Sequence, residues 1–266
     1  MPFPQQCVYA AKLGYDGLEV APYTFSDEPH RMGAAQIAAA RAAAADAGIA
    51  VTGLHWLLLK PQGLSISTRD AAVRKRTVDV MLALIDQCAE LGGRYLVHGS
   101  PQQRRVETGD TRAAALARAQ ECFAAVAERA EKAGVVYCIE ALSADQTPLV
   151  NTLEEAAQMV QAIGSRAVRS MLDCSAAGRM ETAPLPALVD TWVPRGMIAH
   201  VQVNDRNRRG PGQGEQRFAP LLAALVRHGY AGDIAVEPFD YVPDGPGAAA
   251  RAIGYIKGIL EALQER

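Results

Sequence analysis

The sequence predicts an α/β protein built as a (β/α)8 barrel whose first strand is missing or minimal. Short apolar, β-branched runs alternate with longer alanine-rich amphipathic segments along the whole chain, and this alternation is typical of βα units around a parallel sheet. The length of 266 residues exceeds the usual single-core size, but barrels of this kind fill that range as one domain. We therefore expect residues 1–266 to form one domain.

Seven runs have the composition of buried strands. They are Gly17–Ala21, Ala50–Leu54, Tyr95–His98, Val135–Glu140, Arg169–Leu172, Ile198–Val203 and Asp233–Glu237. Eight amphipathic segments are predicted as helices, near residues 4–13, 33–47, 69–91, 111–133, 152–163, 186–195, 217–228 and 247–263. Several of these end at a glycine that can take the left-handed cap conformation, namely Gly14, Gly48, Gly92, Gly134, Gly164 and Gly229.

The start of the chain departs from this repeat. A (β/α)8 barrel begins with a strand, whereas this sequence opens directly into a predicted helix. Either the first strand lies upstream of Met1, or residues 1–4 supply a minimal one, or the barrel closes imperfectly. Pro2 and Pro4 argue against the second option, because each proline removes a backbone donor from a strand ladder.

Composition excludes several classes of function. A net charge of −2 gives no electrostatic case for binding nucleic acid or an anionic membrane. We find no leader-like opening segment and no run of about eighteen apolar residues, so we expect a cytoplasmic protein. The five cysteines are odd in number and scattered, which favours reduced thiols over disulfides or a zinc knuckle.

Chemistry-bearing side chains cluster at the later strands. Glu140, Asp173 and Glu237 lie at strand ends, and His200 lies within a strand. The carboxyl ends of parallel barrel strands meet at one rim, so these residues are expected to converge. Carboxylates packed together repel one another unless a cation offsets the repulsion, and this donor set suits Mn²⁺, Mg²⁺ or Co²⁺. The alternative is that each acid caps a helix or pairs with an arginine.

Four segments, in this order and spacing, resemble the xylose-isomerase-like family of sugar isomerases and epimerases. They are IEALSADQTPLVNT, MLDCSAAG, HVQVNDRNRRGPGQGE and AVEPFDY. The family includes ketose 3-epimerases, hydroxypyruvate isomerase and inosose dehydratase, and the resemblance covers nearly the whole chain.

The resemblance implies a divalent metal, most often Mn²⁺, held by Glu140, Asp173, His200 and Glu237. It also implies that Glu140 and Glu237 are the catalytic acid/base pair and that Arg206, six positions after the histidine, contacts substrate. This residue set also suits one reaction independently of the resemblance. Removal of a proton beside a carbonyl gives an enediolate, and a bound metal stabilises its negative charge. Return of the proton then completes an epimerisation or isomerisation.

Two departures from the ketose 3-epimerase pattern weaken a simple assignment to that activity. Ala176 and Gln146 stand where those enzymes usually carry a histidine and an acid. A lyase or dehydratase acting on a keto-sugar or inosose would use the same metal site. A non-catalytic barrel subunit is a third reading.

Four residues of earlier strands are candidate substrate contacts. His55 and His98 follow or end strands, Glu19 lies near the end of another, and Trp56 can stack on the apolar face of a sugar. The alternative for each of these residues is a structural role, in core packing or helix capping. For Arg208 and Arg209, a solvated loop is slightly favoured over a phosphate-binding role.

The expected partner is therefore a small sugar or keto-acid substrate, without nucleic acid or membrane. A homo-oligomer is compatible with this sequence, because an incomplete barrel edge is often covered by association.

Overall fold

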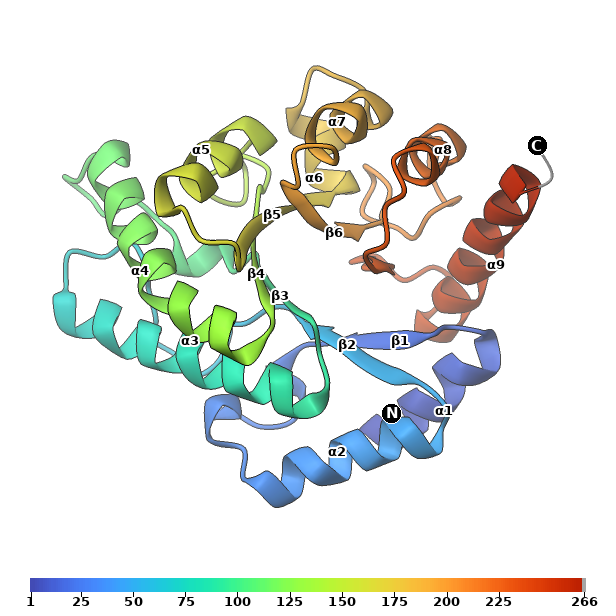
Figure 1. The fold of residues 1–266 in the computed structure, drawn as a ribbon, viewed down its shortest axis with the longest axis horizontal. Helices are drawn as coiled ribbons and strands as arrows, with labels where there is room; N and C mark the ends of the chain where they lie inside the picture. Colours follow the sequence, from blue (N-terminus) through green and yellow to red (C-terminus); the bar gives the residue numbers. More distant parts are fainter. Residues whose placement is uncertain (265–266) are drawn as a thin grey trace.

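The computed structural model describes residues 1–264 and shows a ring of parallel strands inside a shell of helices (Figure 1). Within those residues the sheet has seven strands, which pair in chain order. The strands are β1 (Gly17–Val20), β2 (Ala50–Leu54), β3 (Tyr95–His98), β4 (Val136–Glu140), β5 (Val168–Asp173), β6 (Ile198–Gln202) and β7 (Ile234–Ala235). All seven predicted strands are present, and β2 and β3 have the predicted bounds.

Helices connect the strands and form the outer shell. They are α1 (Phe3–Leu13), α2 (Ala34–Asp46), α3 (Ala71–Leu91), α4 (Arg112–Ala133), α5 (Leu153–Ile163), α6 (Cys174–Met180), α7 (Leu185–Trp192), α8 (Ala219–Arg227) and α9 (Gly245–Gln264). Short 3₁₀ turns occupy Pro22–Thr24, Pro29–Arg31 and Pro101–Gln103. All six glycines expected to cap helices have positive φ, which confirms that part of the prediction.

The ring of strands is open between β1 and β7, which do not pair in the described part of the chain. The chain enters α1 before its first strand, as expected from the sequence. In place of a strand ladder, α1 packs beside α9 (Figure 1). The hydroxyl of Tyr15, just after α1, donates to the backbone oxygen of Ala249 in α9 at 2.8 Å. Helix packing therefore joins the two ends of the sheet.

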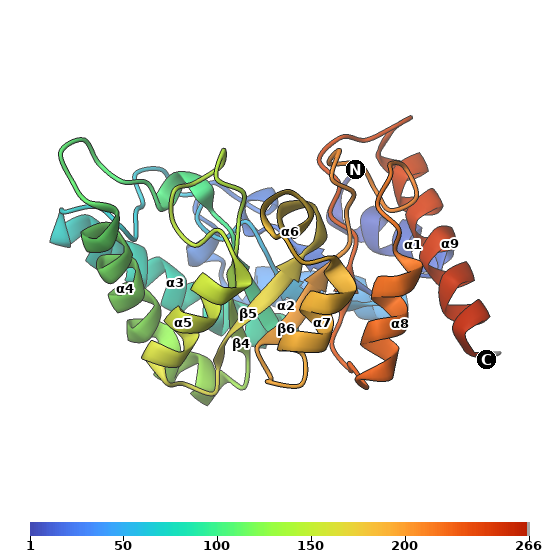
Figure 2. The same cartoon turned by 90° about the horizontal axis from the view of Figure 1, so that it is seen from above.

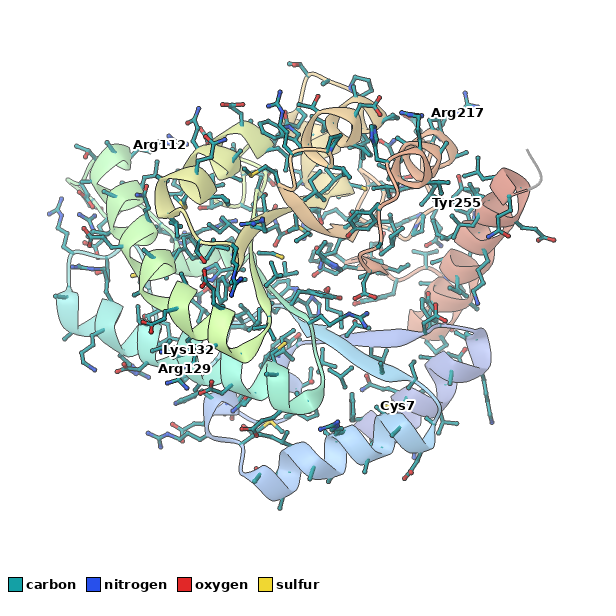
Figure 3. All side chains as sticks on the ribbon, in the orientation of Figure 1. Cys7, Arg112, Arg129, Lys132, Arg217 and Tyr255 are labelled. Atoms are coloured by element: carbon teal, nitrogen blue, oxygen red, sulfur yellow. The ribbon has the colours of Figure 1, made fainter. Side chains whose placement is uncertain are left out.

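Side chains fill the molecule on both faces of the sheet (Figure 3). Alternate residues of adjacent strands form one buried cluster, Tyr95, Val97, Cys138 and Met171. Side chains on the opposite strand faces pack against the helices. The barrel interior thus holds an apolar cluster below a polar rim.

The loops that follow the strands gather along one edge of the molecule (Figure 2). Strand β7 is shorter than the predicted Asp233–Glu237, so Glu237 lies in the loop after it. Helix α6, which the sequence pattern did not predict, begins immediately after β5. The five cysteines are free and buried. Among residues 1–264, no helix is both long and apolar enough to cross a membrane.

Candidate active site

Three carboxylates from β4, β5 and the β7 loop form the centre of the polar rim. Glu140 is 6 % exposed and Asp173 is 5 % exposed. Burial, followed by the charges of Asp173 and Glu237, raises the pKa of Glu140 well above its ordinary value. Burial and the charge of Glu237 raise the pKa of Asp173 to about 7. The three groups therefore repel one another, as carboxylates sharing a site do.

Asp173 is held in place by backbone and side-chain donors. It is the N-cap of α6, and its Oδ1 accepts from the backbone N–H of Ala176 at 2.6 Å. The side-chain amide of Asn204 donates to Asp173 Oδ2 at 3.1 Å and to the backbone oxygen of Glu237 at 3.0 Å. Asn204 was not among the expected site residues, although it lies just beyond β6, where site residues were expected.

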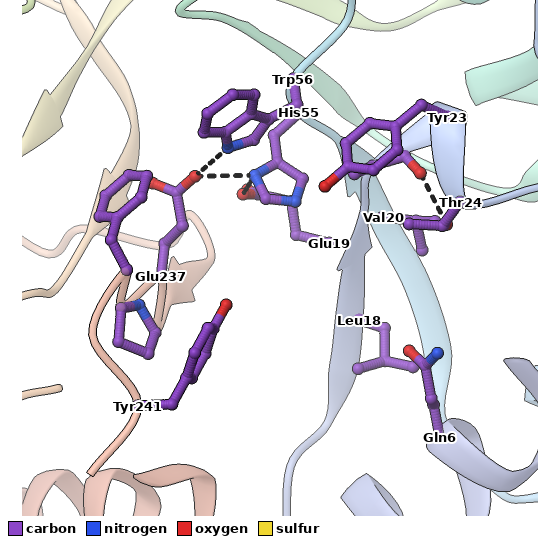
Figure 4. A pocket seen from close by; sticks show the side chains of 13 residues that line it. Gln6, Leu18, Glu19, Val20, Tyr23, Thr24, His55, Trp56, Glu237 and Tyr241 are labelled. Carbon is purple, nitrogen blue, oxygen red and sulfur yellow. Dashed lines mark hydrogen bonds and ion pairs between the residues drawn. The ribbon is translucent and has the colours of Figure 1, made fainter. Parts of the chain in front are cut away.

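Glu237 is anchored by two residues that follow β2 (Figure 4). Its Oε1 accepts from Nε1 of Trp56 at 2.9 Å and lies 3.0 Å from Nδ1 of His55. Trp56 has a φ of 52°, a conformation that a bulky residue adopts rarely and that is often found at functional sites. Both predicted substrate contacts, His55 and Trp56, thus lie against a predicted catalytic carboxylate.

A second charged group is centred on Glu19. Its Oε2 lies 2.7 Å from Nε2 of His200, and its Oε1 lies 3.3 Å from Nδ1 of His55 and accepts from the Gln202 amide at 2.7 Å. Burial alone would raise the pKa of Glu19, but the two imidazoles and the amide outweigh it and lower the pKa to about 2. The expected metal ligand His200 therefore contacts Glu19 and is not brought to the three carboxylates.

A cavity of about 410 Å³ opens beside this rim, at the break between β1 and β7. Its walls come from β1, the residues after β2 and the 237–241 loop, and they include Glu19, His55, Trp56 and Glu237 (Figure 4). A smaller adjoining space of about 30 Å³ is lined by both Glu140 and Glu237. Gln146 also lines this smaller space. The two predicted catalytic glutamates therefore face a common solvent-accessible volume.

Two expected substrate contacts lie away from these cavities. His98 is fully buried outside the strand ring, with Nδ1 2.7 Å from the Tyr137 hydroxyl and its edge against Phe123 of α4. Burial lowers the pKa of His98 well below its ordinary value, so the ring is neutral. Arg206 is exposed and lies near Gly178 of α6. The structure thus does not bring His98 or Arg206 to either cavity.

Arg208 has a closer relation to the site than Arg206. Its guanidinium carbon lies 4.6 Å above the ring of Phe239, and Phe239 lines both cavities. Arg208 also has a φ of 68°, and its backbone oxygen accepts from the N–H groups of Phe239 and Asp240. These contacts couple the loop after β6 to the loop after β7.

The positive charge of Arg104 acts against the raised pKa of Glu140. The side chain is 1 % exposed, and its three guanidinium nitrogens have no hydrogen-bond partner in residues 1–264. Its charge lowers the pKa of Glu140, but this effect is smaller than the increase caused by burial and the neighbouring carboxylates. Within residues 1–264, no three or more His, Cys, Asp or Glu side chains are grouped so that they could bind one metal ion.

Comparison with known proteins places this arrangement among sugar-converting enzymes. The profile of the xylose isomerase-like TIM barrel family matches residues 7–259. The D-psicose 3-epimerase of Agrobacterium fabrum is 27% identical over 232 residues, covering 86% of this chain and 76% of that protein. The D-psicose 3-epimerase of Ruminiclostridium cellulolyticum is also 27% identical, over 246 residues, covering 86% and 75%.

Solved structures agree on the fold. A D-psicose 3-epimerase crystallised in the presence of D-fructose superposes with a TM-score of 0.79 at 25% identity, covering 95% of this chain and 84% of that one. An L-ribulose 3-epimerase gives a TM-score of 0.82 at 22% identity, covering 99% and 90%. The barrel described above is therefore shared with these proteins.

Proposed function

Because the chain belongs to the xylose isomerase-like TIM barrel family, we propose that it is a divalent-metal-dependent isomerase or epimerase of small ketoses. We further propose that it acts as one domain comprising residues 1–266, through an enediolate intermediate. The observation that carries this proposal is that Glu140 and Glu237 line one small cavity next to a larger one. Two carboxyl groups at one reacting centre suit proton removal and return.

The three carboxylates are oxygen donors of the kind that bind a divalent cation, although they are not grouped as a metal site within residues 1–264. Glu140, Asp173 and Glu237 repel one another, and burial and this repulsion raise the pKa of both Glu140 and Asp173. Arg104 offsets only part of this charge, and a cation would offset the rest. Oxygen donors favour Mn²⁺ or Mg²⁺, of which we propose Mn²⁺. When bound, the cation would stabilise negative charge that develops on the substrate oxygens.

The protein residues supply the proton transfers and the orientation. Glu237, fixed by Trp56 and His55, presents one carboxylate to the cavity. Glu140 presents a second from β4. One of these glutamates removes the proton beside the carbonyl, and the other returns a proton. Return to the same carbon inverts that centre, whereas return to its neighbour moves the carbonyl.

The proposed substrate class is a small ketose. A volume of about 410 Å³ falls in the range of small-molecule sites. Trp56 and Phe239, whose ring centroids are 6.1 Å apart, give the cavity apolar walls on which a sugar face can pack. The curated relatives are named for D-psicose and L-ribulose, so ketohexoses and ketopentoses are the first candidates.

The test is turnover in D₂O. Full-length protein loaded with Mn²⁺ is incubated with D-psicose, D-fructose and L-ribulose, and products are followed by chromatography and NMR. We expect one deuterium at the carbon that changes configuration or oxidation level, in an intact carbon skeleton. An unsaturated product would contradict the proposal in favour of a dehydratase, and no turnover of any ketose would contradict it altogether.

A further inference from the structure

Strand β6 carries two polar side chains, His200 and Gln202, on the same face, because residues two apart in a strand point the same way. The register of the sheet pairs Gln202 with Asp173 of β5. At about 3.3 Å per residue, His200 lies roughly 6.6 Å further from the carboxyl end of the strand. The β6 side chain that lies level with the carboxylate of Asp173 is therefore the amide of Gln202.

The amide of Gln202 has a fixed orientation. Its Nε2 donates to Oε1 of Glu19 at 2.7 Å. An ionised carboxylate only accepts hydrogen bonds, so the nitrogen must be the atom that contacts Glu19. The other amide atom, Oε1, is buried and has no hydrogen-bond partner within residues 1–264. The residue is 0 % exposed, and a buried carbonyl oxygen in that state costs free energy unless something binds it.

His200 lies against Glu19 and Tyr95, and its Nδ1 has no hydrogen-bond partner within residues 1–264. Its Nε2 lies 2.7 Å from Glu19 Oε2, and its ring stacks on Tyr95 at a centroid distance of 4.0 Å and an interplanar angle of 21°. The ring is 0 % exposed. Moving this imidazole to the three carboxylates would break the contact with Glu19 and the stack together.

We propose that Gln202, through Oε1, is the fourth protein ligand of the metal centre. In this arrangement His200 is a positioning residue that holds Glu19, and Glu19 in turn orients the Gln202 amide. The inference rests on the proposed function, because it concerns the same cation.

An amide ligand changes the metal preference of the site. Glu140, Asp173, Glu237 and Gln202 form a set of oxygen donors only, which is typical of Mg²⁺ and Mn²⁺ sites. An imidazole in place of the amide would favour Co²⁺ and Zn²⁺. The unmodified protein should therefore discriminate less strongly for Zn²⁺ over Mn²⁺ than the variant Gln202→His.

The experiment is pulsed EPR on the full-length protein loaded with Mn²⁺, which detects the ¹⁴N nucleus of a directly bound imidazole. Unmodified protein and Gln202→His are compared, with His200→Asn as the matched control at the neighbouring inward position. Affinity for Mn²⁺ is measured in parallel by continuous-wave EPR titration, with Gln202→Leu included. Thermal unfolding of each metal-free variant by circular dichroism verifies that it is folded.

We expect no strong ¹⁴N coupling in the unmodified protein or in His200→Asn, and a strong coupling in Gln202→His. We expect the Kd for Mn²⁺ to rise on the order of tenfold or more in Gln202→Leu. A strong imidazole coupling in the unmodified protein, or an unchanged Kd in folded Gln202→Leu, overturns the assignment of Gln202 and leaves the proposed function standing. Failure of the unmodified protein to bind Mn²⁺ overturns the metal-dependent function and the assignment together.

Discussion

The Nε2 atom of His200 lies 2.7 Å from Oε2 of Glu19, and this contact joins β6 to β1 across the interior of the barrel. Both side chains are buried, with exposed fractions of 0 % and 6 %. A buried carboxylate depends on such a partner, because removing one member leaves an uncompensated charge.

Replacing His200 with phenylalanine should therefore lower the free energy of unfolding of the metal-free protein by about 3 kcal/mol at pH 7. The pKa of Glu19 is depressed to about 2. Its stabilising contribution is therefore present above its ordinary value of 4.5 and is lost as the pH falls toward 2. Urea denaturation between pH 3 and pH 8 measures the free energy of unfolding of both proteins. If His200→Phe lost as much stability on acidification as the unmodified protein, the pairing of His200 with Glu19 would be contradicted.

Glu140→Gln and Glu237→Gln should each lower kcat by about 10² to 10⁴, the usual contribution of a general acid or base. Neither should reduce the thermal stability of the metal-free protein, since a neutral amide removes charge repulsion between the clustered carboxyls. Steady-state kinetics and thermal melts check this, with the exposed Glu261→Gln as control. Activity within threefold of the unmodified protein in either variant would rule out its assigned role.

The affinity for Mn²⁺ should rise with pH up to about 7. Burial and the charge of Glu237 raise the pKa of Asp173 to about 7, so below that pH the folded protein holds a proton that the cation must displace. Release of one proton gives about a tenfold gain in affinity per pH unit. The same raised pKa means that the metal-free protein loses stability as the pH rises from about 4 to 7.

Calorimetric titration of Mn²⁺ in two buffers of different ionisation enthalpy counts the protons released. We expect about one or more at pH 6 and fewer at pH 8. A count that does not change between these pH values would contradict the titration of Asp173.

Arg208→Ala should raise KM for the ketose about tenfold, whereas Arg206→Ala should leave KM within about twofold. Both side chains are exposed, but Arg208 stacks on Phe239, which lines both cavities, whereas Arg206 lies near α6. Loss of a cation–π contact and of a charged hydrogen-bond donor together corresponds to about 1 to 2 kcal/mol. Steady-state kinetics on the two variants compare the increases in KM. A larger increase in Arg206→Ala than in Arg208→Ala would support Arg206 as the substrate contact.

Tyr15→Phe should lower the free energy of unfolding by about 1 kcal/mol, because the hydroxyl donates to Ala249 at 2.8 Å and deletion leaves that oxygen without its donor. Tyr9→Phe in α1 is the control and should have no measurable effect. Chemical denaturation monitored by circular dichroism compares the two. Equal effects would mean that the contact between Tyr15 and α9 does not stabilise the packing of α1 against α9.

The fold was largely predictable because its strands are short, apolar and separated by amphipathic helices, and the two periodicities differ. The order of α1 before the first strand was expected because the sequence opens directly into a predicted helix. Helix α6 was not predicted, since its seven residues carry a glycine and no helical apolar repeat. Asp173 is the N-cap of this helix, which the sequence analysis gave as the alternative to its prediction as a metal ligand.

The site was predictable only in part. Strand ends gave Glu140, Asp173 and Glu237, but sequence does not give the direction of a side chain in a strand buried on both faces. All four residues of β3 are buried, so nothing in the pattern showed that Val97 faces inward and His98 outward.

The register between strands is equally invisible in sequence. A shift between Ser170 and Leu172 sets the level of β6 against β5 and brings Gln202 opposite Asp173. Counting six positions from His200 led to Arg206, whereas the same count from Gln202 leads to Arg208. Under the proposed assignment of Gln202 to the metal, the contacts predicted at His200 and Arg206 both move by two residues.

The packing of α1 against α9 also constrains how the chain folds. Tyr15 and Ala249 are separated by 234 positions, so their contact forms only after α9 has left the ribosome. Strand neighbours from β1 to β7 can pair progressively during synthesis, each soon after its predecessor. The packing of α1 against α9 therefore waits for the synthesis of α9, and the entropic cost of closing so long a loop arises in that step.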